Sequence, residues 1–346
     1  MNIQEGLGYT RITPNQQQMY KSMIAAFSKG EPSCIIPYTP SGEEIFVALS
    51  TALGDNPEVV YFNSTQIDTE VTSGGLRVEF QACLPKAQAL KLSAELDAKA
   101  ESITAPIRSA GGDPYTQLIK IYEYLQKNVR YDQQEYANIS AGNVSNLKAY
   151  NAYGALIEGK ALCGGFAAAL GLLAKKLGFQ CMTVSGYSSI HNTGVTDHGW
   201  NIVKVGTCHY HMDVTWDTCY HHNTGTLQYN YFALTDDEVF TNHDWNISTT
   251  PPCTHNDLSF YVRNKLIANN KEQLENIFRA AGRNIGKPVY VKLSENITLP
   301  EDSESAGNYL MQLLQTEAEK EISDDSSFSI GGFWNDNQRC FFGMLR

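Results

Sequence analysis

The sequence predicts an α+β protein. Several segments carry apolar residues three and four positions apart, as helices packed on a core do, and others are short strand-like runs joined by tight turns. With 346 residues the chain exceeds one ordinary domain. Its 42% hydrophobic and 18% charged residues are enough for a sizeable core and exclude wholesale disorder.

Residues 1–110 are expected to form an α+β accessory domain. The hydroxyl of Thr13 suits the N-cap of a helix that has Pro14 at its first position, and Gly30 ends that helix. The other predicted elements are a helix over 41–54, a strand over 59–62, a hairpin over 69–84 around Gly74-Gly75, and a long helix over about 85–107.

Residues 111–250 are expected to form the central domain. A helix should begin at Asp113-Pro114, and a polar loop should follow Tyr131. The clearest element is a buried helix over about 163–177, along which apolar residues recur at intervals of three and four. Three strands should come next, over 179–187, 198–205 and 208–215. The two-residue turn Gly206-Thr207 pairs the last two strands antiparallel.

Residues 251–346 are expected to form an α/β appendage after the Pro251-Pro252 pair. Its predicted elements are a helix near 271–281, a strand over 288–293, an acidic helix over 303–321 and a final hairpin around 335–337.

Cys163 is the candidate nucleophile among the eight cysteines. It stands at the predicted N-terminus of the buried helix, where free N–H groups and the positive end of the helix dipole stabilise a thiolate. The same N–H groups suit a developing oxyanion. Gly164 and Gly165 follow, each costing roughly 1 kcal/mol relative to alanine in a helix, which suggests close approach of a substrate backbone to the sulfur.

His198 and Asp213 are the candidate partners of this thiol. His198 opens the second predicted strand, and Asp213 lies near the end of the third. In the predicted register His198 faces Thr215, two positions from Asp213 on the same face of the sheet. A carboxylate in that place would fix the tautomer of the imidazole and leave its other nitrogen for the thiol. The spacing therefore permits a Cys-His-Asp triad.

Three ordered segments around these residues resemble the motifs of the transglutaminase-like superfamily. They are Leu162-Cys163-Gly164-Gly165-Phe166-Ala167, Asp197-His198-Gly199-Trp200-Asn201 and Tyr210-His211-Met212-Asp213-Val214-Thr215-Trp216-Asp217. Two upstream segments, Ala152-Tyr153-Gly154-Ala155-Leu156 and Gly159-Lys160, resemble bacterial multidomain members. The resemblance implies a papain-like core in which the nucleophile helix packs on an antiparallel sheet. It makes Cys163 the nucleophile, His198 the general base and then acid, and Asp213 the residue that orients His198.

The activity that this resemblance implies is thiol-dependent cleavage of amide bonds in protein or peptide substrates, cell-wall peptides included, through an acyl-thioester intermediate. It implies no cofactor. Two alternatives stay open: a protein transamidase that uses the same triad for crosslinking, and a non-catalytic binding or scaffold module. An upstream aromatic or amide side chain often completes the oxyanion site in the superfamily, and Tyr131 and Tyr153 are candidates. Gly164 and Trp200 are further candidates for substrate or oxyanion contacts.

Two histidines leave a weaker alternative. His209, His211 and Asp213 alternate along one strand, as ligands of a metal-dependent hydrolase would.

Charge and hydropathy bear on partners and location. The net charge of −11 makes nucleic acid and anionic membrane surfaces poor partners. The longest apolar run, residues 167–174, is far too short to span a membrane. No leader pattern precedes the first helix. Because relatives of this type are often exported, we expect an extracellular or cell-surface location if a leader was removed, and a cytoplasmic one otherwise.

Overall fold

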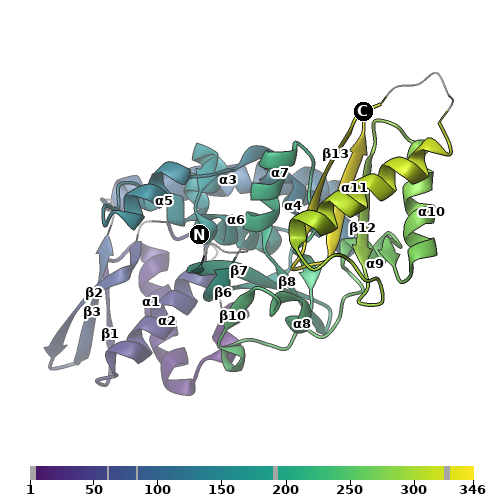
Figure 1. The fold of residues 1–346 in the computed structure, drawn as a ribbon. Coiled ribbons are helices and arrows are strands. Elements are labelled where there is room, and N and C mark those ends of the chain that lie inside the picture. The colour runs from purple at the N-terminus through teal and green to yellow at the C-terminus, as the bar shows by residue number, and fades with distance from the viewer. Residues whose placement is uncertain (1–4, 61, 83–84, 190–193, 323–327) are drawn as a thin grey trace.

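The computed structural model describes residues 5–60, 62–82, 85–189, 194–322 and 328–346. The chain runs from an N-terminal unit of helices and a small sheet, through a central sheet covered by helices, to a C-terminal sheet with two helices (Figure 1). The mixture of helices with antiparallel sheets confirms the predicted α+β class.

The N-terminal unit holds a three-stranded sheet in the order β1-β3-β2. Its elements are η1 (Gly8–Arg11), α1 (Pro14–Lys29), β1 (Ser33–Ile36), α2 (Gly42–Asp55), β2 (Phe62–Thr72), β3 (Gly75–Ala82) and α3 (Lys86–Ala110). Thr13 and Ser41 both form capping boxes, which confirms the predicted starts of the first two helices. The predicted hairpin is also present. The strand expected over 59–62 is wrong in its start, because β2 begins only at Phe62.

The central unit places helices over a five-stranded antiparallel sheet in the order β10-β6-β7-β8-β9. Its helical elements are α4 (Pro114–Asn128), α5 (Gln133–Ser140), η2 (Leu147–Tyr150), η3 (Gly154–Glu158), α6 (Cys163–Lys176), α7 (Val214–Thr224), α8 (Asp236–Val239) and η4 (Ile247–Thr249). Its strands are β4 (Arg130–Tyr131), β5 (Lys160–Ala161), β6 (Gln180–Ser189), β7 (Val195–Val205), β8 (Cys208–Met212), β9 (Phe232–Leu234) and β10 (His243–Trp245).

The register of β7 and β8 is the predicted one, but β8 is shorter than predicted. The pairs run from Val205 opposite Cys208 to Asn201 opposite Met212. The strand then stops, because the side chain of Asp213 caps the first turn of α7. His198 therefore does not pair with Thr215, and the predicted strand over 208–215 is wrong beyond Met212.

The polar segment after Tyr131 also differs from expectation. It contains α5, whose first turn is capped by the carboxylate of Asp132 on the N–H of Glu135.

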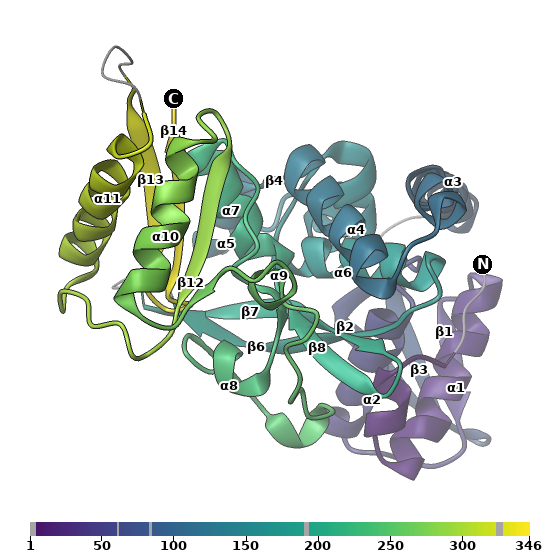
Figure 2. The ribbon, with the colours of Figure 1, turned by 90° about the vertical axis from the view of Figure 1, so that its right-hand side faces the viewer.

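The C-terminal unit is a sheet in the order β11-β12-β14-β13 with α10 and α11 on one face (Figure 2). Its elements are α9 (Phe260–Arg263), β11 (Ile267–Ala268), α10 (Lys271–Gly282), β12 (Pro288–Leu293), α11 (Ser303–Glu319), β13 (Ile330–Asn335) and β14 (Cys340–Leu345). The elements predicted for this region are confirmed. Apolar side chains of both helices form a separate core against the sheet.

The C-terminal sheet is joined to the central unit by specific contacts. The hydroxyl of Tyr290 donates to the carbonyl of Leu227 at 2.8 Å. The side-chain amide of Gln338 donates to the carbonyl of Glu238 at 2.9 Å and to the hydroxyl of Thr241 at 3.0 Å. The C-terminal sheet thus holds the segment that leads from α8 into β10.

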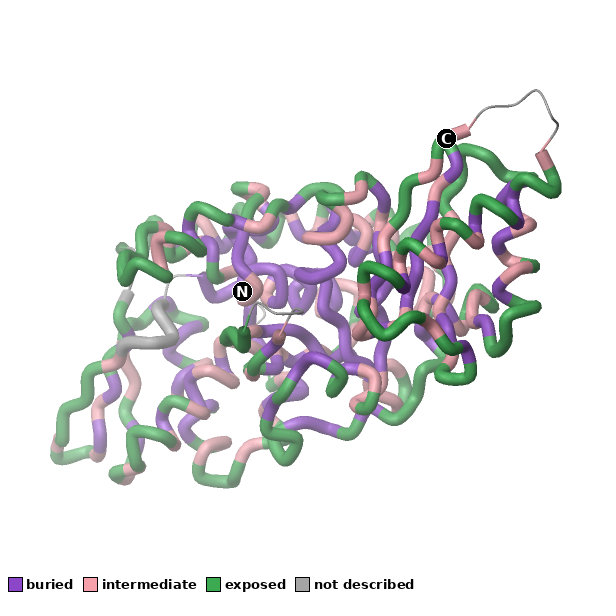
Figure 3. Tube along the Cα trace, in the orientation of Figure 1, coloured by how far each residue is buried: buried purple, intermediate pink, exposed green. Residues whose placement is uncertain are grey.

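The N-terminal and central units share one continuous core, which runs through the middle of the molecule (Figure 3). Helix α6 lies in it, packed on β6 and β7, with Phe166, Leu170 and Leu173 fully buried. At the end of α6, the ammonium group of Lys175 forms a 2.9 Å ion pair with Glu58. The helix that begins at Cys163 is therefore fixed along its length. No helix in the described part of the chain is long and apolar enough to cross a membrane.

Candidate active site

The thiol of Cys163 lies at the first residue of α6 and is partly exposed. The first N–H groups of a helix have no intrahelical partner, and no side chain caps this end of α6. Burial tends to raise the pKa of Cys163. The hydrogen bond and charge of His198, together with the backbone N–H of Gly199, outweigh burial and lower it. The site therefore favours a thiolate.

The imidazole of His198 connects this thiol to a carboxylate. Its Nε2 lies 2.6 Å from Oδ2 of Asp213, so Nδ1 is the nitrogen left for the sulfur of Cys163. Burial tends to lower the pKa of His198, but the charge and hydrogen bond of Asp213 overcome it and raise the pKa to about 10. The lowered pKa of Cys163 and the raised pKa of His198 both favour a thiolate–imidazolium pair.

Asp213 receives donors on both of its oxygens. Its Oδ1 accepts from the N–H groups of Thr215 and Trp216, at 3.0 and 3.4 Å, in the first turn of α7. Its Oδ2 accepts from His198 and also lies 3.1 Å from Nε2 of His243. Burial opposes ionisation, but His198 and His243 hold the pKa of Asp213 well below its usual range. The structure thus brings the three predicted triad residues together and adds a second histidine.

Sequence reasoning missed His243. It lies on β10, which pairs with β6 at one edge of the sheet, and no local motif marks it. Only the long-range pairing of His243 with Ser188 places it beside Asp213.

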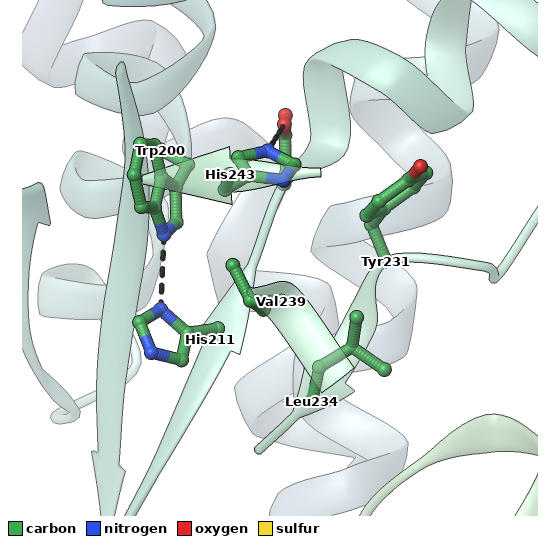
Figure 4. A pocket seen from close by; sticks show the side chains of 7 residues that line it. Trp200, His211, Tyr231, Leu234, Val239 and His243 are labelled. Carbon is green, nitrogen blue, oxygen red and sulfur yellow. Dashed lines mark hydrogen bonds and ion pairs between the residues drawn. The ribbon is translucent and has the colours of Figure 1, made fainter. Parts of the chain in front are cut away.

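Trp200 supports the site from within the core and does not face a substrate. It is 1% exposed, and its indole stacks on the ring of His198 with centroids 5.9 Å apart. Its N–H donates to Nδ1 of His211 at 2.9 Å (Figure 4). The predicted role of Trp200 in substrate or oxyanion contact is therefore not supported by its position.

The two tyrosine candidates lie in different environments. The hydroxyl of Tyr153 is 3.1 Å from Glu95 on α3, and the ammonium group of Lys148 lies 5.0 Å from the centre of its ring. Tyr153 is thus engaged with α3. Tyr131 lies close to Cys163: burial raises the pKa of Tyr131, and the charge of Cys163 raises it further. Tyr131 remains the candidate for an oxyanion contact.

The two glycines after Cys163 differ in what they accommodate. A Cβ on Gly165 would lie 2.4 Å from the carbonyl oxygen of Ala149, whereas a Cβ on Gly164 would lie 3.4 Å from that of Tyr150. Gly165 therefore allows the chain around η2 to pack against α6, which corrects the expectation that both glycines make room for substrate. Gly164 remains the candidate for close approach of a substrate.

His211 is poorly suited to bind a metal. Because Trp200 donates to Nδ1, the proton of the neutral ring lies on Nε2, which is 2.8 Å from Oδ1 of Asp236. A metal ligand needs a free nitrogen lone pair, and here one nitrogen accepts a hydrogen bond and the other carries a proton. Within the described residues, the groupings of close His, Cys, Asp and Glu side chains do not include His209.

Comparisons with known proteins give one family match and several similar solved structures. A model of the transglutaminase-like superfamily matches residues 101–216. Among solved structures, a TGase is similar at 13% identity and a TM-score of 0.31, over 43% of this chain and 44% of that one. A candidate cysteine protease from Cytophaga hutchinsonii is similar at 14% identity and a TM-score of 0.28, over 43% and 61%. The chain thus covers less than two thirds of either structure.

No curated protein matches the chain. The matched segment contains the thiol, the imidazole and the carboxylate described above, carried by α6, β7 and the start of α7. Residues 101–216, the segment that carries this site, are thus similar to the transglutaminase-like superfamily.

Proposed function

We propose that this protein is a thiol enzyme that cleaves amide bonds in protein or peptide substrates through an acyl-thioester intermediate. One observation carries the proposal. A partly exposed cysteine at a helix N-terminus is paired with a histidine whose other nitrogen is 2.6 Å from a buried carboxylate. This arrangement supplies a nucleophile, a proton donor and a group that orients the donor.

The steps follow from these positions. The thiolate of Cys163 attacks the carbonyl carbon, and the free N–H groups of the first turn of α6 stabilise the oxyanion. The imidazolium of His198 then gives its Nδ1 proton to the leaving amine as the C–N bond breaks. In the second half, neutral His198 takes a proton from water, whose oxygen attacks the thioester, and Cys163 leaves as a thiolate.

We propose hydrolysis rather than transfer to an amine because water needs no binding site of its own. A transamidase would use the same thioester and resolve it with a primary amine. Peptidoglycan stem peptides are included among the proposed substrates together with ordinary peptides.

The test uses defined peptides with and without a primary amine such as cadaverine, and mass spectrometry of the products. One set carries glutamine residues and another consists of cell-wall stem peptides, and Cys163→Ala serves as the matched control. Cleavage without amine, absent in C163A, is the expected result. Products that form only with amine would replace the peptidase by a transamidase. No product from any peptide, together with an unreactive Cys163, would favour the scaffold alternative.

A further inference from the structure

A second imidazole shares the carboxylate oxygen that orients His198. Nε2 of His243 lies 3.1 Å from Oδ2 of Asp213, and Nε2 of His198 lies 2.6 Å from the same atom. The side chain of His243 is fully buried. Figure 4 shows it beside Trp200 and facing Tyr231, with ring centroids 4.8 and 5.7 Å away.

The carboxylate of Asp213 is held by four donors, and His243 is the only one that the triad and the helix cap do not account for. Oδ1 is taken by two backbone N–H groups of α7. Oδ2 is divided between the two imidazoles. A buried carboxylate with every acceptor direction occupied cannot rotate without breaking a hydrogen bond, so its orientation toward His198 is fixed.

Building on the proposed function, we infer that His243 is a positioning residue, which donates a hydrogen bond to Asp213 as a neutral Nε2–H imidazole. This hydrogen bond fixes the carboxylate of Asp213. It also weakens the attraction of that carboxylate for the proton on His198. His243 touches neither the thiol nor the reacting bond, so it acts through Asp213 alone.

The surroundings of His243 favour this neutral form. The groups that face it are Asp213, His198, His211, Tyr231 and Asn242. Burial lowers the pKa of His243, the hydrogen bond and charge of Asp213 oppose this, and His198 and His211 lower the pKa further. A second imidazolium on the same carboxylate would repel the imidazolium of His198, whose ring centre is 5.5 Å away.

The other nitrogen of His243 also has a suitable partner. Nδ1 lies 2.8 Å from Oδ1 of Asn242, and Nδ2 of the same amide donates to the hydroxyl of Tyr231 at 2.7 Å. The oxygen and nitrogen of an amide occupy nearly equivalent positions, so the amide can be turned by 180° without moving its heavy atoms. The neutral Nε2–H form of His243 requires this turned orientation, in which the NH₂ group of Asn242 donates to Nδ1 and its oxygen accepts from Tyr231.

Removing this donor has a definite electrostatic effect. Without it, more of the negative charge of Asp213 faces His198, which raises the proton affinity of His198 most and that of Cys163 less. The imidazolium then gives its proton to the leaving amine less readily. Turnover falls, although a thiolate still forms.

His243→Leu tests the inference, with His243→Gln as the matched control, because a Gln side-chain amide can donate to Asp213 but does not titrate. In H243L we expect the pH profiles of Cys163 alkylation and of turnover to move to higher pH. The acidic limb, which reports ionisation of Cys163, should move less than the alkaline limb, which reports deprotonation of His198 and should move by about one pH unit. The value of kcat at pH 7 should fall about tenfold. H243Q should keep the parent profile. A purely structural role would lower stability and the amplitude of both profiles without moving either limb.

A measurement on the unmutated protein tests the inference even if the H243L variant does not fold. Nitrogen-15 NMR of labelled histidine reports the tautomer of His243 directly, and we expect the neutral Nε2–H form at pH 7. An imidazolium, an Nδ1–H tautomer, or unmoved limbs in folded H243L would overturn the inference. The alkylation and NMR readouts need no substrate. They therefore test the role of His243 even if no peptide is cleaved. If peptides are cleaved but the pH profiles of H243L do not move, the role of His243 is wrong and the proposed function still stands.

Discussion

Nε1 of Trp200 donates a hydrogen bond to Nδ1 of His211 at 2.9 Å. The same indole stacks under His198, at an interplanar angle of 20°. The hydrogen bond therefore fixes the ring on which His198 rests, and the fully buried core around Trp200 is part of what holds the site in place.

Replacing Trp200 by phenylalanine separates stacking from hydrogen bonding. W200F retains an aromatic ring under His198 but leaves Nδ1 of His211 without a donor and creates a small cavity. We expect a loss of about 2–4 kcal/mol in the free energy of unfolding in urea. The alkylation rate of Cys163 at pH 7 should change less than threefold. A stable W200F with unreactive Cys163 would instead give Trp200 a direct role in the site.

The thiolate–imidazolium pair predicts how alkylation depends on pH. The pKa of Cys163 is lowered mainly by His198, against burial, so iodoacetamide should label Cys163 rapidly well below pH 8. Burial raises the pKa of Cys181 to about 12, which makes this thiol an internal control. In His198→Ala the labelling of Cys163 should shift to higher pH. Peptide mass spectrometry measures each cysteine separately, and equal rates at Cys163 and Cys181 would contradict the assembled pair.

Asp213 carries two roles that substitutions can separate. An asparagine oxygen can still cap α7 but carries no charge for His198, whereas alanine loses both. D213N should slow alkylation of Cys163 at pH 6 at least tenfold, and D213A should in addition lose about 1–2 kcal/mol of unfolding free energy from the missing cap.

The pH dependence of stability gives a second check on Asp213. Its pKa in the folded protein lies below the unfolded value, so its ionised form stabilises the fold above the unfolded pKa. The stability difference between parent and D213N should be full at pH 7 and shrink as the pH falls below about 4. Urea unfolding at several pH values measures it, and a pH-independent difference would argue against a depressed pKa.

Tyr131 and Tyr153 provide a matched pair of hydroxyl deletions. If Tyr131 stabilises the oxyanion, Tyr131→Phe should reduce kcat by about 10²-fold without changing the alkylation rate of Cys163. Tyr153→Phe should leave kcat unchanged, because its hydroxyl is engaged by Glu95. Equal kcat values in Y131F and the parent would remove Tyr131 from the oxyanion site.

The adjacent glycines should respond differently to the same substitution. Gly165→Ala forces a Cβ to 2.4 Å from a backbone carbonyl, which must move, so we expect a loss of about 1–3 kcal/mol. Gly164→Ala meets its nearest atom at 3.4 Å, so its effect on stability should be under about 1 kcal/mol. Thermal unfolding of the two variants compares them, and an equal loss would show that Gly164 also serves packing.

Much of the fold followed from local signals in the sequence. Caps at Thr13 and Ser41 placed two helices, and the Gly206-Thr207 turn placed β7 against β8 in the correct register. Two local signals were missed. Asp132 with Glu135 three positions later is a helix-start pattern. Asp213 also caps a helix, but the Val and Thr that follow it favour strands.

The part of the site that the sequence did not predict depends on contacts between distant residues. His243 reaches Asp213 only because β10 adds to the edge of β6. The sequence suggested that Trp200 contacts a substrate, but the structure buries it. Its burial depends on β10 and on Trp245, whose ring centre is 5.6 Å away, and neither contact can be inferred from the residues next to Trp200. Short sequence motifs predict the candidate triad residues. The residues that support the triad, such as His243 and Trp200, are brought to it by tertiary packing, which the local sequence does not reveal.

The contacts of Gln338 with Glu238 and Thr241 have a consequence for biosynthesis. A ribosome releases Cys163 long before it makes Gln338, and the segment that carries His243 is not secured until the C-terminal sheet has formed. The candidate nucleophile is therefore made before the residues that complete its surroundings. During synthesis, the support that the C-terminal sheet gives to the segment carrying His243 is added only after Gln338 has been made.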